Sequence, residues 1–311
     1  MRELNAEGLD VLAVLERDSM LESFHHGVVA VVDPEGNLSY AKGDVFALIY
    51  PRSALKPVQA AAMRRAGLSL PEAQAVMTMA SHYGTDRQVE LVRDVLRSQQ
   101  LSEDYLRCPE ALPWNQDAKF GKTASSLFMN CSGKHAGFLA TSKLNGWDLK
   151  KYLQRTHPMQ KKVRELLEVF AGEKIEKAST DGCGAPLFAL STAGLARAIS
   201  NFVQQEPALV KAAIANPELI GDEQTPDAGF LRAGLFSKLG AEGVFAVATS
   251  DGHALAMKVA DGSLRPAAVY AATLLNRLGL ISSQQMVLAL GTDKTEVKGG
   301  EKTIGGWELY F

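Results

Sequence analysis

Strand-forming runs lie at both ends of this chain of 311 residues, and helical patterns fill the part between them. Near the N-terminus, β-branched and aromatic residues fill 27–33 and 46–50, with Pro, Gly and Asn between them as is typical of turns. Two further runs flank a turn at 250–253, and the final segment 305–311 is expected to add an edge strand. Because a sheet must cover its apolar face, we expect the N- and C-terminal strands to share one antiparallel sheet.

The middle of the chain, from Pro57 to about Asn201, carries apolar residues at spacings of three and four. This spacing is typical of amphipathic helices, which we expect within 91–100, 160–172 and 186–203. The predicted fold class is therefore α+β, with the helical middle packed as its own layer against the sheet. We find no internal repeat or linker, and we expect 215–229 to be an exposed loop.

Charge and cysteine usage exclude several classes of function. The chain has 33 Lys and Arg against 35 Asp and Glu, and no basic block, so we expect no nucleic-acid partner. No run reaches the ~18 apolar residues of a membrane helix, and the polar N-terminus does not look like an export signal. We therefore expect a cytoplasmic protein with reduced cysteines and no membrane partner.

A Ser-x-x-Lys spacing occurs at Ser53 and Lys56. On a helix this spacing puts both side chains on one face, so the lysine amine can reach the serine hydroxyl and activate it. Chance gives on the order of one such match in a chain of this length, and Ser39 with Lys42 is a second one, in an expected strand. Ser53 instead precedes a helix-forming run, and Pro57 favours a 3₁₀-like or bent start that moves Lys56 from ideal helical geometry.

Two further segments carry candidate residues. Ser81 and His82 end an apolar segment in MASHYGTD, where His82 alone is more often structural than catalytic. Lys258 shares one face of an expected strand with alanines, while Leu255 and Met257 point to the opposite, core face. Lys258 is thus either a solvated surface lysine or a base that lines a cleft.

Two cysteines lie in glycine-flanked loops that precede helical patterns: Cys131 in NCSGKHAG and Cys183 in STDGCGAP. Their thiolates could bind a soft metal such as zinc, with a lysine, histidine or water completing the site. They do not form a CxxC pair. The alternative interpretation is that both cysteines are buried and unreactive.

In their order along the chain, these segments resemble the rhizobial-type (class 3) L-asparaginases, whose fold is similar to the serine β-lactamases and glutaminases. The matching segments include YPRSALKPVQA, SHYG, NCSGKHAGFLA, DGCGAP, KLGAEGV and ALAMKVADG. The resemblance implies a single catalytic domain over 1–311 with a helical subdomain over about 57–201, and a homodimer. It also implies two Ser-Lys pairs and a zinc site; the pairs are Ser53 with Lys56 and Ser81 with Lys258, and the zinc ligands are Cys131, Lys134 and Cys183.

The expected reaction is hydrolysis of L-asparagine to L-aspartate and ammonia. Ser53 is expected to attack, activated by Lys56 or through Ser81 by Lys258, with one lysine kept neutral by the charge of the other. Zinc is expected to orient substrate rather than to generate the nucleophile. The expected substrate-binding residues are Arg52 for the α-carboxylate, Asp181 for the α-ammonium, and His135.

Two alternatives stay open on the sequence alone. One is a hydrolase of a related amide or ester, such as glutamine or a β-lactam. The other is a catalytically silent homologue that binds metal or an amino acid.

Overall fold

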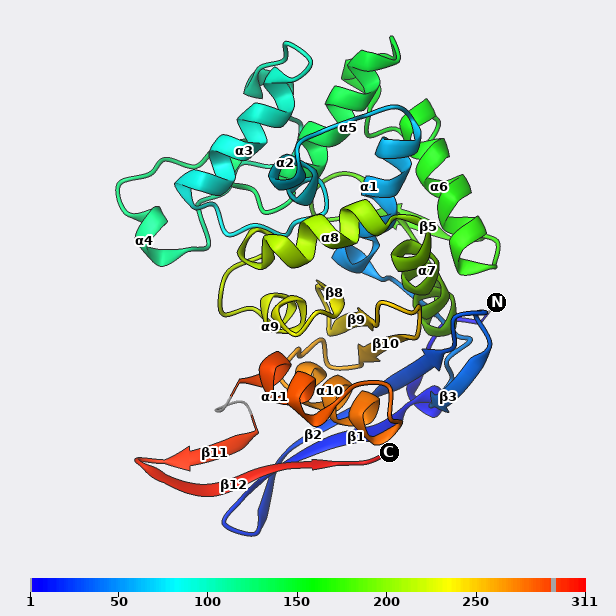
Figure 1. Cartoon of the computed structure of the whole chain (residues 1–311), viewed down its shortest axis with the longest axis vertical. Coiled ribbons are helices and arrows are strands. Elements are labelled where there is room, and N and C mark those ends of the chain that lie inside the picture. The colour runs from blue at the N-terminus through cyan, green and yellow to red at the C-terminus, as the bar shows by residue number, and fades with distance from the viewer. Residues whose placement is uncertain (1, 292–294) are drawn as a thin grey trace.

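An antiparallel sheet forms the centre of the computed structural model, which describes residues 2–291 and 295–311 (Figure 1). Its strands are β1 Asp10–Arg17, β2 Met20–Val32, β3 Leu38–Lys42, β8 Phe236–Gly240, β9 Val244–Ala248, β10 Ala254–Val259, β11 Glu296–Gly299 and β12 Lys302–Leu309. They follow the order β11-β12-β1-β2-β10-β9-β8, and β3 pairs with β2 off this path. Strands from the two ends of the chain are neighbours, so the predicted α+β class and the shared antiparallel sheet are confirmed.

Two pairs of short strands lie outside this sheet: β4 Leu48–Ile49 with β7 Leu190–Ser191, and β5 Ala178–Thr180 with β6 Pro186–Phe188. The helices are α1 Lys56–Arg65, α2 Glu72–Met77, α3 Asp86–Arg97, α4 Gln116–Lys119, α5 Ser132–Leu144, α6 Pro158–Ala171, α7 Thr192–Gln205, α8 Pro207–Ala215, α9 Pro226–Arg232, α10 Ala267–Arg277 and α11 Ser283–Leu290. Short 3₁₀ turns include η2 Arg52–Leu55 and η6 Pro217–Leu219. No helix in the described part of the chain is long and apolar enough to cross a membrane.

The predicted helices within 91–100 and 160–172 are confirmed by α3 and α6, but the third prediction is only partly correct. Residues 186–191 form β6 and β7, and the helix begins at Thr192. The hydroxyl of Ser191 accepts a hydrogen bond of 2.8 Å from the backbone N–H of Gly194, which caps the helix there.

Helices cover both faces of the sheet, because alternate side chains of each strand point to opposite faces. The face that carries Ala30, Ala246 and Ala256 packs against α7. The opposite face, with Val247 and Met257, packs against α10. Figure 1 shows α1 to α6 on one side of the sheet and α10 and α11 on the other. The prediction of a single helical layer is therefore incomplete. The helices α10 and α11 form a second layer, which the sequence patterns did not predict.

Two further expectations need correction. The C-terminal strand β12 is not at the edge of the sheet, because it lies between β11 and β1. The sequence patterns did not predict β1 as a strand. The segment 215–229 is not a simple exposed loop, because Leu219 and Ile220 are buried and α9 begins within it. This segment instead closes one side of a cleft.

Candidate active site

Ser53 and Ser81 line one cleft of about 710 Å³, although they come from different elements. Ser53 lies in η2, at the start of α1, and Ser81 lies in the segment after α2. The other residues that line the cleft are Tyr83, Trp114, Asn115, Gln116, Asp117, Asn130, Asp222, Gln224, Thr225, Pro226, Leu239, Ala241 and Leu264. The cleft thus joins the predicted nucleophiles to the segment 215–229 and to the end of β8.

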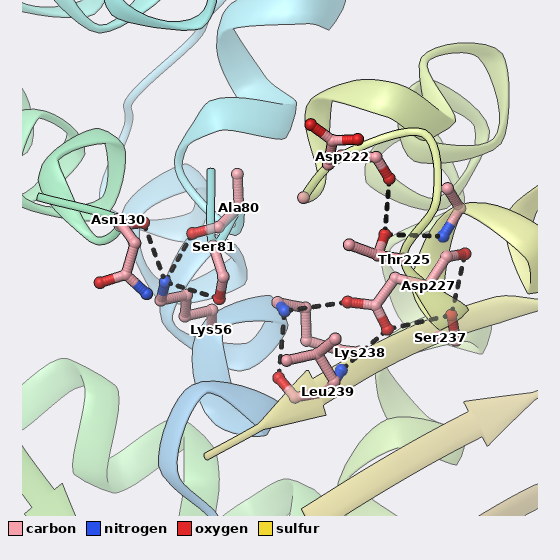
Figure 2. A network of polar contacts seen from close by, with 12 residues as sticks. Lys56, Ala80, Ser81, Asn130, Asp222, Thr225, Asp227, Ser237, Lys238 and Leu239 are labelled. Atoms are coloured by element: carbon pink, nitrogen blue, oxygen red, sulfur yellow. Dashed lines mark hydrogen bonds and ion pairs between the residues drawn. The ribbon is translucent and has the colours of Figure 1, made fainter. Parts of the chain in front are cut away.

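The buried amine of Lys56 is held by three oxygen atoms at the base of this cleft (Figure 2). Its Nζ lies 2.6 Å from the carbonyl oxygen of Ala80, 3.0 Å from the hydroxyl of Ser81 and 3.5 Å from the carbonyl oxygen of Asn130. Burial lowers the pKa of Lys56 to about 8, helped by the nearby Lys134 and Lys238 charges and opposed by Cys131. A lysine with such a pKa can act as a general base.

The start of α1 has the predicted 3₁₀ geometry. The turn η2 runs from Arg52 to Leu55, and Lys56 follows it with φ −56° and ψ −35°. These are ordinary α-helical angles, so the expected distortion of Lys56 itself is not found. Pro57 lies in the first helical turn, where its missing N–H costs no hydrogen bond.

The structure pairs Ser81 with Lys56 and not with Lys258. The Lys258 amine donates to the backbone carbonyls of Glu242 and Val259, the latter at 2.8 Å. Burial lowers the pKa of Lys258, although Glu242 opposes this shift. The alanines beside Lys258 allow α7 to pack closely, so they do not form an open substrate channel.

A lysine that the residue-level reasoning did not single out, Lys238 on β8, lies beside the Lys56 and Ser81 pair. Its Nζ lies 3.1 Å from Oδ2 of Asp227 and 3.0 Å from the carbonyl oxygen of Leu239. Figure 2 shows this amine between Asp227 and the Ser81 side of the cleft. The sequence signal was present, because Lys238 opens KLGAEGV, one of the segments that carry the family resemblance.

Gly240 allows β8 to come this close to the serine-bearing turn. A Cβ atom at this position would lie 2.5 Å from the carbonyl oxygen of Pro51 and 3.2 Å from the backbone nitrogen of Ala54. Only glycine fits such an approach without movement of the backbone. The position of Lys238 beside Lys56 therefore depends on this contact between β8 and η2.

His82 has a structural place next to Ser81. The backbone N–H of Gly84 donates to Nδ1 at 3.1 Å, so Nε2 carries the proton and donates to the Ser132 hydroxyl at 2.7 Å. Burial, with the Lys56 charge, lowers the pKa of His82 to about 3, so the ring is neutral. His82 thereby ties the Ser81 segment to the start of α5.

Cys131, Lys134 and Cys183 are buried together near Lys56. A hydrogen bond from the Cys131 thiol, with the Lys134 charge, holds the pKa of Cys183 well below its usual range, although burial opposes this. The Lys134 amine donates to the Cys183 sulfur at 3.1 Å. Burial disfavours the Lys134 charge, but Cys183, Cys131 and Asp181 outweigh it and raise its pKa.

These donors fit zinc, which binds thiolates and nitrogen. Among residues 2–291 and 295–311, no three His, Cys, Asp or Glu side chains lie together so that they could hold a metal ion. The third protein ligand would therefore be the Lys134 amine. Binding would have to displace its proton, since a metal ligand needs a free lone pair.

Arg52 and Asp181, the expected substrate ligands, bond to each other beside this cluster. Nε of Arg52 lies 2.8 Å from Oδ1 of Asp181. Burial disfavours the Asp181 carboxylate, but Lys134 and Arg52 together hold its pKa below the ordinary value. Arg52 has a φ of 52°, a backbone conformation that non-glycine residues rarely adopt and that clusters at ligand sites. Its Nη1 also lies 4.0 Å from the carboxylate of Glu242, which is exposed.

His135 presents a buried nitrogen without a hydrogen-bond partner among the described residues. The backbone N–H of Arg107 donates to the Tyr152 hydroxyl at 3.0 Å, and this hydroxyl lies 2.7 Å from Nδ1 of His135. Burial, then the Lys134 charge, lowers the pKa of His135 to about 3. The ring is therefore neutral, and its Nε2 has no hydrogen-bond partner among the described residues.

Comparison with known proteins gives one family. The family model described as L-asparaginase II matches residues 13–308, nearly the whole chain. None of the curated proteins that were compared matches the chain.

Several solved structures are similar to this chain at low identity. Mglu in its native form shares 12% identity over 83% of this chain and 66% of its own, with a TM-score of 0.45. Mglu in its glutamate form shares 12% identity over 82% of this chain and 61% of its own, with a TM-score of 0.48. A beta-lactamase from Mycobacterium bovis shares 13% identity over 81% of this chain and 94% of its own, with a TM-score of 0.36. The chain thus spans 66% and 61% of the length of these two Mglu chains.

Proposed function

The chain belongs to the L-asparaginase II family, and on this premise we propose that it hydrolyses L-asparagine to L-aspartate and ammonia through a serine acyl-enzyme. Family membership makes it an asparaginase-type amidohydrolase. The observation that carries the proposed mechanism is the 3.0 Å contact between the Lys56 amine and the Ser81 hydroxyl.

We assign attack to Ser53 and proton transfer to Ser81. Ser53 is partly exposed in the cleft, whereas Ser81 is buried and already bonded to Lys56. As the Ser53 oxygen bonds to the amide carbon, its proton passes to Ser81, and the Ser81 proton passes to Lys56. Lys56 then returns a proton to the leaving nitrogen as the C–N bond breaks. A water molecule hydrolyses the resulting ester and restores the Ser53 hydroxyl.

In this proposal Lys238 takes the place of Lys258 as the second lysine near the reaction. Its charge disfavours a proton on Lys56, which supports the neutral amine that a base requires. The Lys258 amine is bonded to backbone carbonyls instead.

The substrate's two charges match the pair of Arg52 and Asp181. Arg52 uses Nε on Asp181, and its Nη1 makes a loose contact of 4.0 Å with the exposed Glu242 carboxylate. The substrate α-carboxylate would replace this second contact. The ionised Asp181 can accept from the α-ammonium. The buried Nε2 of His135 is a further polar atom that a bound ligand would satisfy.

We also propose that Cys131, Lys134 and Cys183 hold zinc, as the family resemblance implies. When bound, zinc would supply a positive charge beside Asp181 that orients the substrate-binding loop. A homodimer is proposed on the same resemblance, and light scattering in solution tests it.

An ammonia assay tests the proposed function. We expect the native protein to release ammonia from L-asparagine faster than from L-glutamine. We expect Ser53→Ala to abolish release, while L-asparagine still binds in calorimetry. Mass spectrometry of the native protein, quenched during turnover, should find the aspartyl group on Ser53. An acyl group on Ser81 would reverse the two serine roles, and binding without ammonia release from any amide would favour the silent homologue.

A further inference from the structure

Asp227 and Lys238 form an ion pair in which neither side chain is exposed: the exposed fractions are 1% and 0%. Removing two charges from water is costly, and apolar side chains of similar size often make a more stable core. Such a pair is weak evidence for a role in stability alone. Its place beside the cleft of Ser53 and Ser81 instead indicates a role in the reaction.

The Asp227 carboxylate is fixed in orientation by its neighbours. Oδ1 accepts from the backbone N–H of Leu239 at 2.8 Å. The Ser237 hydroxyl shares its one proton between the Asp227 carbonyl oxygen at 3.2 Å and Oδ1 at 3.3 Å. Oδ2 accepts from the Lys238 amine at 3.1 Å. One oxygen thus anchors the carboxylate to β8, and the other is left for the lysine. The carboxylate and the amine are therefore held in fixed positions relative to each other.

Lys238 keeps one N–H free for a ligand. An ammonium has three N–H donors, and two of them have partners in Asp227 and the carbonyl oxygen of Leu239. Within the described part of the chain, no protein acceptor takes the third. Figure 2 shows the amine on the side of Asp227 that faces Ser81 and Lys56.

We propose that Asp227 is a positioning residue that holds Lys238 as an ammonium, with its free N–H directed at the oxyanion of the tetrahedral intermediate. This inference rests on the proposed function and adds a division of roles to it. Lys56 moves the proton, and Lys238 stabilises charge without giving up its own proton. As the Ser53 oxygen bonds to the amide carbon, the carbonyl electron pair moves to oxygen, where the ammonium hydrogen bonds it. The pair returns when the C–N bond breaks.

Kinetics of an isosteric variant tests this inference. Loss of an oxyanion donor typically lowers kcat by about 100-fold to 1,000-fold, and we expect Asp227→Asn to fall in this range, with KM within about threefold. Lys238→Met should lose as much, and the double variant should be no slower than Lys238→Met, because the two residues act as one unit. Ser237→Ala is the matched control: it removes a neutral donor to the same carboxylate, so kcat should stay within about threefold.

A second measurement tests the ion pair directly, so that an unfolded variant or an inactive wild type can be recognised. In protein labelled with [15N]lysine at neutral pH, the Lys238 ammonium resonance, identified by its absence in Lys238→Met, should appear in wild type and Ser237→Ala. It should disappear in Asp227→Asn, while circular dichroism reports a folded protein. If wild type cleaves no amide, the proposed function fails, and this resonance still tests the ion pair. A neutral Lys238 in wild type, or full kcat in Asp227→Asn, would overturn the inference.

Discussion

The Lys56 amine lies 3.0 Å from the Ser81 hydroxyl, and the carbonyl oxygens of Ala80 and Asn130 occupy its other hydrogen-bonding positions. A carbonyl oxygen only accepts, so both carbonyls must receive N–H groups from Lys56. In the neutral amine this leaves the lone pair for the Ser81 proton. The arrangement therefore suits a lysine that takes a proton from serine.

The pH dependence of hydrolysis should report Lys56. Only the neutral amine can act as base, so kcat/KM should rise with pH through an apparent pKa of about 8. Below this value we expect roughly a tenfold loss per pH unit. Lys238→Met should move the midpoint upward, because the positive charge of Lys238 disfavours a proton on Lys56. Initial rates between pH 6 and 10 check this, and a flat profile would exclude Lys56 as the base.

Substitution of Lys56 should remove the base without removal of the cleft. General-base catalysis contributes about 100-fold to 10,000-fold, and we expect Lys56→Met to lose kcat on this scale. The matched control is Lys42→Met, from the second Ser-x-x-Lys spacing, since Lys42 is on β3 and does not line the cleft. Ammonia release measures both. Full activity in Lys56→Met would contradict the proposed proton route.

Local sequence rules predicted the parts of the site that depend on neighbouring residues. Ser53 and Lys56 lie on one turn as expected from their spacing, but the Lys56 amine bonds to Ala80, Ser81 and Asn130, and no hydrogen bond joins it to the Ser53 hydroxyl among the described residues. The 3₁₀ start followed from Pro57, which is adjacent to Lys56. A shared site for Cys131 and Cys183 was one of two interpretations that the residues left open. The family resemblance favoured it, because no local rule joins residues so far apart.

Strand alternation did not distinguish Lys258 from Lys238, because it fixes a face of the sheet but not a position along the strand. Lys258 pairs with Val244, whereas Lys238 pairs with Ala246, which pairs in turn with Ala256. Lys238 therefore lies two residues farther along the sheet, or about 7 Å, and on another strand. Its contacts with α9 and η2 are tertiary contacts, which periodicity cannot reveal.

Metal binding should depend on two of the three cysteines. We expect Cys131→Ser and Cys183→Ser to bind zinc at least about tenfold more weakly than wild type, since each loses a thiolate ligand. Cys108→Ser is the control, because the Cys108 thiol donates to the carbonyl oxygen of Ser126 at 3.4 Å. Zinc content after dialysis measures retention. Calorimetry in two buffers should also show proton release, as expected if Lys134 must lose its proton.

Equal zinc retention in wild type and Cys183→Ser would contradict this ligand set. Retention lost in Cys108→Ser as well would show that the cluster tolerates no change in packing.

Arg52 and Asp181 should each recognise one charge of the substrate. Succinamic acid lacks the α-ammonium of asparagine, and 3-aminopropanamide lacks the α-carboxylate. We expect Asp181→Asn to reduce the preference for asparagine over succinamic acid, and Arg52→Met to reduce the preference over 3-aminopropanamide, each by at least about tenfold in kcat/KM. Each variant should affect its own comparison more than the other.

Nε of Arg52 lies 2.8 Å from Oδ1 of Asp181, so loss of one side chain also frees the other. The double variant is therefore needed to separate substrate recognition from the bond between the two residues. If Arg52→Met changed the rates for all three amides equally, Arg52 would support the turn that carries Ser53 rather than bind the carboxylate.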